Sequence, residues 1–498
     1  MADPSDEPGV HFPLRAGRRG STPTSRGVLA DSVAGIDPEL AERIRSADGW
    51  RTHYVDHVVA VTEASALSPA TADEIADEGL ASLRRRMVLV DADGAETPLA
   101  EAAIDRPGEE PPFATESVQG TERPITELVV PYRGSGLSGE ALLAQLDAWV
   151  ECGTVEPSFA TAVGEVIDHP EWLALPGRRV ALIGAGAEMG PLEALLSWGV
   201  DVLAIDLPRS RAWRYKRGLA TKGAGRLAFP ISRDGDAGAD VVHQLGPVLQ
   251  WLRREGGDAP LVLGMHAYAD AGAHVQVSAA TDALIEQLGA ERGVDGLATA
   301  WLATPTDAFV VPPEVVAAAR ESYARRSGMI RWGQRPLRSL SRSKLYAPAY
   351  RQAASGAGGI ADILVPQQGP SYAIAKRLQR WSGLAAQAAG RTVSFNVAPA
   401  TWTRSVTKNP VLAAAYRGAD RFGVEVFPAE TTRALMAALL VRDLSAPPPS
   451  RSHPEGLFSD QAAHGGLWRA GYDPKTVLGI AALTGLPGSL RDRLSRSR

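Results

Sequence analysis

The feature that most constrains the fold is an alternation of short apolar segments and helical patterns that begins at Pro176. Segments such as "RRVALIGAG", "DVLAIDLP" and "PLVLGMHAY" are apolar throughout, instead of alternating between apolar and polar residues. Strands of this kind are buried on both faces, which is typical of a parallel sheet covered by helices. The pattern predicts an α/β fold, a doubly wound parallel sheet of Rossmann type over residues 176–445, with an insertion at about 310–360.

The remaining segments lack this alternation. Residues 1–35 are rich in Pro, Gly, Ser and Arg and are predicted to be a disordered tail. Residues 36–175 mix amphipathic helical stretches with a polar, Pro-rich gap, which indicates an N-terminal domain that is mostly helical or α+β. Residues 446–498 are expected to be a linker and a C-terminal segment.

Composition excludes several classes of protein. The formal net charge of −5 gives no general attraction to nucleic acid or membrane, and no apolar run reaches the ~18 residues of a membrane span. The single cysteine, Cys152, excludes an intramolecular disulfide framework, so a cytoplasmic location is expected. His53 and His57 have the i, i+4 spacing of zinc ligands but no third ligand follows, so no metal site is predicted.

A glycine turn follows the first predicted strand. In "LIGAGAEMGPLEALL", Gly184, Gly186 and Gly190 stand between that strand and a helix. Glycines at this place let the backbone approach a pyrophosphate at the helix N-terminus. Asp206 ends the second strand, where a carboxylate can accept hydrogen bonds from an adenosine ribose. Together these residues predict a nucleotide site.

The turn does not decide which nucleotide binds. S-adenosylmethionine-dependent methyltransferases also use a glycine turn and an acid after the second strand. Arg209, in the basic segment after Asp206, could hold the 2′-phosphate of NADP, whereas Asp206 would repel it. NAD or NADP is expected, with NAD slightly favoured. Glu188 lies within the turn and would repel a pyrophosphate unless it points away or is paired.

Tyr372 and Lys376 are four residues apart in a predicted helix, "QQGPSYAIAKRLQRW". A carbonyl that accepts a hydride also needs a proton donor, and a tyrosine serves if its pKa is lowered. A lysine one helical turn later lies on the same face and supplies positive charge. The pair is therefore interpreted as a proton donor with its activating cation.

The helix and the strand after it resemble the short-chain dehydrogenase/reductase family, which has Tyr-x-x-x-Lys followed by Asn-x-x-x-Pro-Gly and a threonine. Here "TVSFNVAPATWT" provides Asn396 and Pro399, with Ala400 in place of the glycine. The resemblance covers residues 178–445. It implies that Asn396, with Thr401 or Thr403, contacts the cofactor.

This chain also departs from the family pattern in the glycine turn and before the tyrosine. Glu188 replaces the middle glycine of the turn, and Gly359 stands at the offset of the family's carbonyl-orienting serine. The candidates for that role are Thr304 or Thr306, after "LATAWLA", and Ser355.

The segment from Ser322 to Ala361 contains no acid and eight cations, with aromatic residues between them. It could clamp an anionic substrate, contact another subunit, or remain a solvated loop; nucleic acid is the least favoured partner.

The sequence thus predicts an NAD(P)-dependent oxidoreductase that transfers a hydride between a carbonyl and an alcohol. Two alternatives stay open: a nucleotide-binding regulator or scaffold without catalysis, and a methyltransferase.

Overall fold

The computed structural model of the 498-residue chain describes residues 7–104, 113–326, 328–342, 344–350 and 358–495. Its centre is a seven-stranded sheet in the order β16-β13-β12-β9-β10-β11-β6. Six strands are parallel, and β6 pairs antiparallel with β11 at one edge. The strands are β6 (Ala114–Gln119), β9 (Arg179–Ile183), β10 (Asp201–Ile205), β11 (Arg226–Ile231), β12 (Leu261–Met265), β13 (Leu297–Ala303) and β16 (Val393–Val397).

The parallel strands follow the doubly wound order, in which the first strand, β9, lies between the second and the fourth. Each strand is almost fully buried, as its continuous apolar sequence predicts. The protein is therefore an α/β protein with a mostly parallel central sheet flanked by helices, an arrangement compatible with a Rossmann-like fold.

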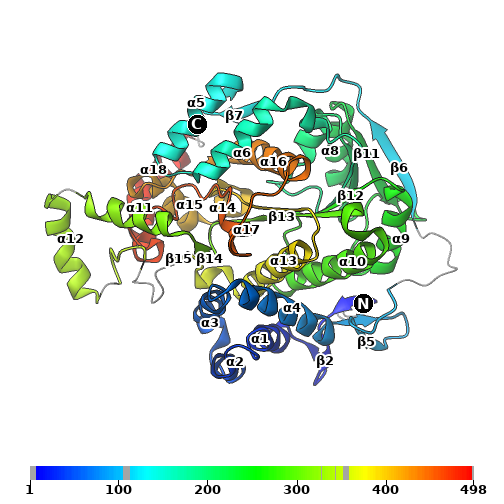
Figure 1. Cartoon of the computed structure of the whole chain (residues 1–498), viewed down its shortest axis with the longest axis horizontal. Coiled ribbons are helices and arrows are strands. Elements are labelled where there is room, and N and C mark those ends of the chain that lie inside the picture. The colour runs from blue at the N-terminus through cyan, green and yellow to red at the C-terminus, as the bar shows by residue number, and fades with distance from the viewer. Residues whose placement is uncertain (1–6, 105–112, 327, 343, 351–357, 496–498) are drawn as a thin grey trace.

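Helices cover both faces of the sheet (Figure 1). Ile183 and Leu203 face one hydrophobic core and Leu182 and Val202 face the other, because successive residues of a strand point to opposite sides. The first core is covered by α9 (Leu245–Gly256), α10 (Gly272–Gly296) and α13 (Pro370–Ala388). The second is covered by α5 (Gly139–Glu151), α6 (Pro157–Asp168), α7 (Leu192–Ser197), α8 (Ser210–Thr221) and α16 (Ala429–Ser445).

Residues 7–35 are folded, contrary to the prediction of a disordered tail over residues 1–35, of which residues 1–6 lie outside the described residues. Val28 and Leu29 are fully buried in α1, so this helix is part of the first core. The N-terminal layer comprises β1 (Gly9–His11), β2 (Leu14–Arg15), β3 (Arg18–Arg19), α1 (Ser21–Ser32), α2 (Pro38–Arg45), α3 (Trp50–Ser65), α4 (Pro69–Arg86), β4 (Val88–Val90) and β5 (Glu96–Pro98).

Residues 36–175 do not form one separate body, because their parts lie on both faces of the sheet. Helix α4 packs on α13, where Gly79 lies against the ring of Trp381 and leaves no room for a side chain. Strand β6 joins the central sheet itself. On the opposite face, α16 is packed against α6 and against the hairpin of β7 (Val130–Tyr132) and β8 (Ser135–Leu137). The short helix η2 (Pro170–Ala174) follows α6 in the chain.

The predicted insertion emerges between β13 and α13. Strands β14 (Ala308–Val311) and β15 (Gly359–Asp362) pair at its base, and α11 (Pro313–Ala324) and α12 (Gly328–Leu340) extend from one end of the molecule (Figure 1). A short helix, η3 (Pro366–Gln368), then leads into α13.

The chain after β16 packs back onto the body. It forms β17 (Thr401–Trp402), α14 (Arg404–Lys408), α15 (Pro410–Arg417), η4 (Ala419–Phe422), β18 (Phe427–Pro428), α16, α17 (Gly456–Ser459) and α18 (Pro474–Ser495). A buried ion cluster anchors this segment: Glu156 accepts hydrogen bonds from Arg469, at 2.6 and 2.9 Å, and from His464, at 2.8 Å. None of the described helices is both long and apolar enough to cross a membrane.

Replacing Glu156 with Gln is expected to lower the free energy of unfolding at pH 7 by about 3–5 kcal/mol, because Arg469 loses its carboxylate in a buried place. Burial alone would raise the pKa of Glu156, but the hydrogen bonds from Arg469 and His464 hold it at about 2. Glu321→Gln, which breaks an exposed pair with Arg325, is expected to change stability by less than about 1 kcal/mol. Chemical denaturation measures the free energy of unfolding of both variants. Equal losses of this free energy in Glu156→Gln and Glu321→Gln would contradict the anchoring role of Glu156.

Candidate functional site

The candidate site lies at the carboxyl ends of the parallel strands, beside the point where the strand order reverses between β9 and β12. Crevices at this point are where doubly wound sheets bind ligands. Gly184 follows β9 with a φ of +76°, and a Cβ atom there would lie 2.4 Å from the Cα atom of Ala267, which follows β12. Only glycine fits this position, so the turn and the end of β12 meet backbone to backbone.

Asp206 lies against the glycine turn, as the sequence predicts. Its Oδ2 atom accepts a hydrogen bond from the Gly186 backbone N–H at 2.9 Å and pairs with the Lys216 ammonium at 2.8 Å. Its Oδ1 atom accepts from the Leu207 backbone N–H at 2.9 Å. A carboxylate has about four acceptor positions, so one position stays available for a ribose hydroxyl. Lys216 belongs to the basic segment that could hold the 2′-phosphate of NADP, and its burial and its pairing with Asp206 were not predicted from the sequence.

Glu188, the acid inside the turn, is held by the loop that follows β16. Its carboxylate accepts a hydrogen bond from the Arg404 backbone N–H at 3.0 Å. Thr403 precedes Arg404, so it lies close to the turn, with its hydroxyl bonded to Ser405 at 2.8 Å. Gly190 closes the turn, where its N–H donates to Ala187 at 3.0 Å.

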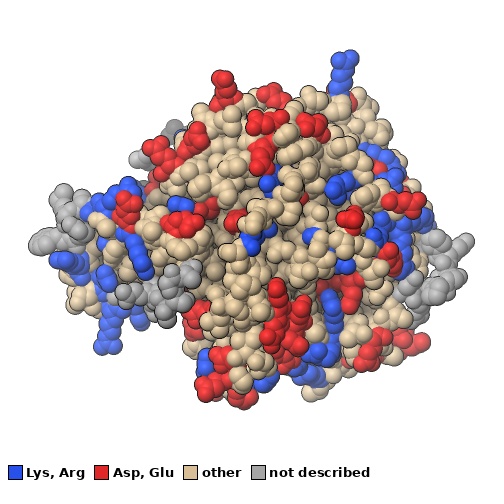
Figure 2. All heavy atoms as spheres, viewed as in Figure 1, with Lys and Arg blue, Asp and Glu red and all other residues tan. Residues whose placement is uncertain are grey.

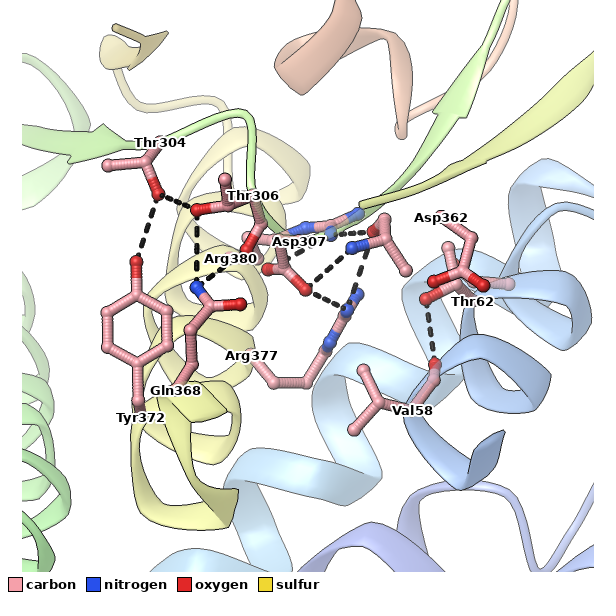
Figure 3. Close-up of polar contacts among 12 residues, drawn as sticks. Val58, Thr62, Thr304, Thr306, Asp307, Asp362, Gln368, Tyr372, Arg377 and Arg380 are labelled. Atoms are coloured by element: carbon pink, nitrogen blue, oxygen red, sulfur yellow. Dashed lines mark hydrogen bonds and ion pairs between the residues drawn. The ribbon is translucent and has the colours of Figure 1, made fainter. Parts of the chain in front are cut away.

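The structure brings Tyr372 and Thr304 together. Their hydroxyl oxygens share a hydrogen bond of 3.0 Å, although 68 residues separate them (Figure 3). Thr304 also bonds the hydroxyl of Thr306 at 3.0 Å, and the Gln368 amide donates to the Thr306 carbonyl at 2.8 Å. Two hydroxyl groups therefore converge where a carbonyl oxygen could accept hydrogen bonds from both.

Lys376 lies one helical turn after Tyr372, but its ammonium group is not free. It donates to the Leu302 carbonyl at 3.0 Å and to the Gln379 side-chain oxygen at 3.0 Å. Burial lowers the pKa of Lys376 to about 8. Burial also raises the pKa of Tyr372, and the Thr304 hydrogen bond only partly offsets this effect. The predicted lowering of the Tyr372 pKa by Lys376 is therefore not observed.

Aromatic rings form a wall around Tyr372. The ring centroids of Tyr268 and His274 lie 6.4 and 5.9 Å from that of Tyr372. His274 is buried on α10 and accepts a hydrogen bond from the Gln379 amide at 3.3 Å, so Gln379 links it to Lys376. Burial, and then the charge of Lys376, lower the pKa of His274 to about 3, so its ring is neutral. Gln379 lies three residues after Lys376 on α13, a spacing that could have identified it.

The loop that carries Thr304 is held by a buried ion network (Figure 3). Asp307 pairs with Arg377 at 3.3 Å and with Arg380 at 3.8 Å, and all three side chains are at most 4 % exposed. Arg380 also pairs with Glu455 at 2.5 Å. The two arginines come from α13, so the same helix presents Tyr372 and fixes the loop opposite it.

Two predicted site residues, Asn396 and Thr401, are buried and face away from the open edge of the sheet. The Asn396 amide is buried and donates to Ser394 and Asp443, toward α16 and not toward the open edge of the sheet. The Thr401 hydroxyl is buried and bonds Pro399 and Thr432. Arg209 is exposed at the start of α8, and Ser355 lies outside the described residues.

The cations of the insertion gather at the end of the molecule formed by α11 and α12 (Figure 2). Three of those described are engaged within the insertion: Arg325 pairs with Glu321 at 2.9 Å, the Arg326 guanidinium lies 3.2 Å from the Tyr323 ring centroid, and Arg338 donates to the Tyr323 hydroxyl at 2.8 Å. A role in binding an anionic ligand or another subunit stays a prediction. Among the described residues no group of three His, Cys, Asp or Glu side chains could hold a metal ion.

The low pKa of Lys376 predicts a dependence of stability on pH. Its pKa is about 8 in the folded chain, against an ordinary value of 10.5, so the unfolded chain binds more protons between these values. The free energy of unfolding should therefore rise between pH 8 and pH 10.5, relative to a Lys376→Met variant, by up to about 3 kcal/mol. Exposed Lys222 provides the control, because wild type and Lys222→Met should show no such divergence. If the free energy of unfolding of Lys376→Met follows pH in parallel with that of wild type, this description of the site is contradicted.

Comparisons with protein-family models, with curated proteins and with solved structures found no match for this chain. The chemistry of the site therefore has to be inferred from its own geometry.

Proposed function

We propose that this protein is an NAD(P)-dependent oxidoreductase that interconverts a carbonyl and an alcohol, in the manner of short-chain dehydrogenases. The observation that carries the proposal is the 3.0 Å hydrogen bond between Thr304 and Tyr372, with Lys376 one helical turn further on. This sequence lacks the family's serine at its usual offset before the tyrosine, and Thr304 would supply the hydroxyl group in its place. A cytoplasmic location, expected from the lone cysteine, belongs to the same proposal.

The residues at the switch point fit a dinucleotide. The turn from Gly184 to Gly190 would face the pyrophosphate, and the carboxylate of Glu188 is already engaged by Arg404. Asp206 keeps one acceptor position for the adenosine ribose. The charge of Asp206 opposes a 2′-phosphate, although the Lys216 ammonium offsets it, so NAD is favoured slightly over NADP.

The chain's own groups would hold the substrate oxygen and supply its proton. Bound nicotinamide would supply the hydride. A carbonyl oxygen placed between the two hydroxyl groups accepts a hydrogen bond from Thr304 and takes its proton from Tyr372. The raised pKa of Tyr372 keeps it protonated at neutral pH, the form that a proton donor needs. The Lys376 ammonium would stabilise the tyrosinate left behind.

A second candidate is a nucleotide-binding regulator without turnover. The raised pKa of Tyr372 favours it, because forming the tyrosinate is then costly. This candidate predicts cofactor binding with no activity toward carbonyls or alcohols. The methyltransferase alternative instead leaves the contact between Thr304 and Tyr372 without a role.

Tyr372→Phe is expected to lower kcat for carbonyl reduction by about 10²–10⁴-fold, because the variant lacks the proton donor. Cofactor affinity should stay unchanged. Thr304→Val should lower kcat less, and Thr304→Ser should restore most of the loss. The measurement is oxidation of NADH or NADPH across a panel of aldehydes and ketones.

Tyr346→Phe is the matched control for this series, because it removes a hydroxyl from the insertion. Reduction at an unchanged rate by Tyr372→Phe would refute the catalytic role of Tyr372. Cofactor binding by wild type without turnover on any substrate of the panel would favour the regulator.

A further inference from the structure

A groove of about 550 Å³ opens on the surface beside the segment that follows β16. One wall comes from Tyr132 and Arg133 at the end of β7 and from Cys152 and Thr154 after α5. The other wall comes from the chain between β17 and β18, including Trp402, Tyr416, Arg417, Asp420, Val424 and Glu425. Its volume lies within the range of small-molecule sites.

Aromatic side chains give the groove its shape. The rings of Trp402 and Tyr416 stand edge to face, with centroids 5.5 Å apart and an interplanar angle of 71°. Both rings are only partly buried, so each offers aromatic surface to a ligand. On the opposite wall, the Tyr132 ring makes edge contact with the ring of Trp149, with centroids 5.0 Å apart. Such rings bind a flat apolar group better than a flexible aliphatic chain.

The charged groups that line the groove balance one another. Two of them are arginines, Arg133 and Arg417, and two are acids, Asp420 and Glu425. The Glu425 carboxylate accepts a hydrogen bond from the Tyr132 hydroxyl at 2.6 Å and pairs with Arg133 at 3.5 Å. A groove with no net charge favours an uncharged ligand, because an ion would lose its hydration without finding a surplus of opposite charge.

The segment that forms one wall of the groove starts beside the loop of Thr304. The Ala398 N–H donates to the Ala303 carbonyl at 2.9 Å, so the chain leading to Trp402 starts beside the strand end that carries Thr304. Burial is the main cause of the raised pKa of Tyr372, and the Tyr416 hydroxyl of the groove adds a smaller contribution. A molecule whose carbonyl lies at Tyr372 could therefore extend into the groove.

We propose that this groove binds the non-reacting part of the substrate, and that the substrate is an uncharged carbonyl compound carrying a flat aromatic or fused-ring group. The proposal rests on the oxidoreductase function put forward above. It also sets aside the anionic substrate that the basic insertion could clamp, because none of the described residues that line this groove comes from α11 or α12.

Cys152 gives a direct readout of occupancy, because it is the only cysteine in the chain, is exposed and lines the groove. Its alkylation by N-ethylmaleimide would be timed in the full-length protein, without cofactor, by mass spectrometry. The probes are 2-acetylnaphthalene, an uncharged aromatic ketone, and 2-naphthoate, an anion of similar size. At about ten times its Kd the ketone should slow alkylation about tenfold, while naphthoate at the same concentration should have little effect.

Variants place the ketone in the groove. Trp402→Ala should abolish the protection, and Trp402→Phe, which keeps an aromatic face, should retain most of it. Cys152 of the Tyr372→Phe variant should still be protected, because this readout needs no turnover. Measurements on the wild-type protein are sufficient to overturn the proposal. The proposal fails if the ketone does not protect Cys152 up to its solubility limit, or if naphthoate protects Cys152 equally well.

This experiment separates the two proposals. Protection of Cys152 in a protein that binds no nicotinamide cofactor would keep the groove and reject the oxidoreductase. Cofactor binding and carbonyl reduction without protection would keep the oxidoreductase and reject the groove as its substrate site.

Discussion

The ion network around Asp307 is the interaction on which the candidate site depends. Asp307 follows β13 by four residues and lies between Arg377 and Arg380, which are one turn apart on α13. Burying two arginines and a carboxylate is costly unless they pair, so the loop and the helix have one favourable arrangement. The Arg380 guanidinium also lies over the rings of Phe309 and Phe458, and Glu455 supplies the second carboxylate. The same arrangement sets the Thr304 hydroxyl against that of Tyr372.

The central sheet brings the two halves of the site to one edge. The glycine turn follows β9, the loop of Thr304 follows β13, and parallel strands carry both to the carboxyl side. The close approach of Gly184 to Ala267 and the contact of Glu188 with Arg404 join neighbouring loops across this edge. A nucleotide at the turn and a carbonyl at Tyr372 would therefore be neighbours.

The sequence predicted those parts of the protein that local pattern determines. Strands buried on both faces, the glycine turn and Asp206 each have a local signature, and the spacing of Tyr372 and Lys376 follows from helical geometry. Prediction from the sequence failed where long-range contacts determine the secondary structure. Strand β6 reads as polar loop because an edge strand is half exposed, and α1 was missed because its buried pair, Val28 and Leu29, lies among glycines and arginines.

The same limit applies inside the site. Thr304 could be named only as one of three candidates, because 68 residues and an insertion separate it from Tyr372. Lys216 and Gln379 carry no motif, yet they bind Asp206 and Lys376. The pKa of Tyr372 depends on burial, which no spacing in the sequence reveals.

Calorimetric titration of the purified protein with NADH, NADPH and S-adenosylmethionine tests the central claim most directly. The geometry of the glycine turn and Asp206 predicts binding of a reduced nicotinamide cofactor, and its loss in Gly186→Val, whose added side chain would meet the Asp206 carboxylate at 2.7 Å. Binding of S-adenosylmethionine alone, or of none of the three, would contradict it.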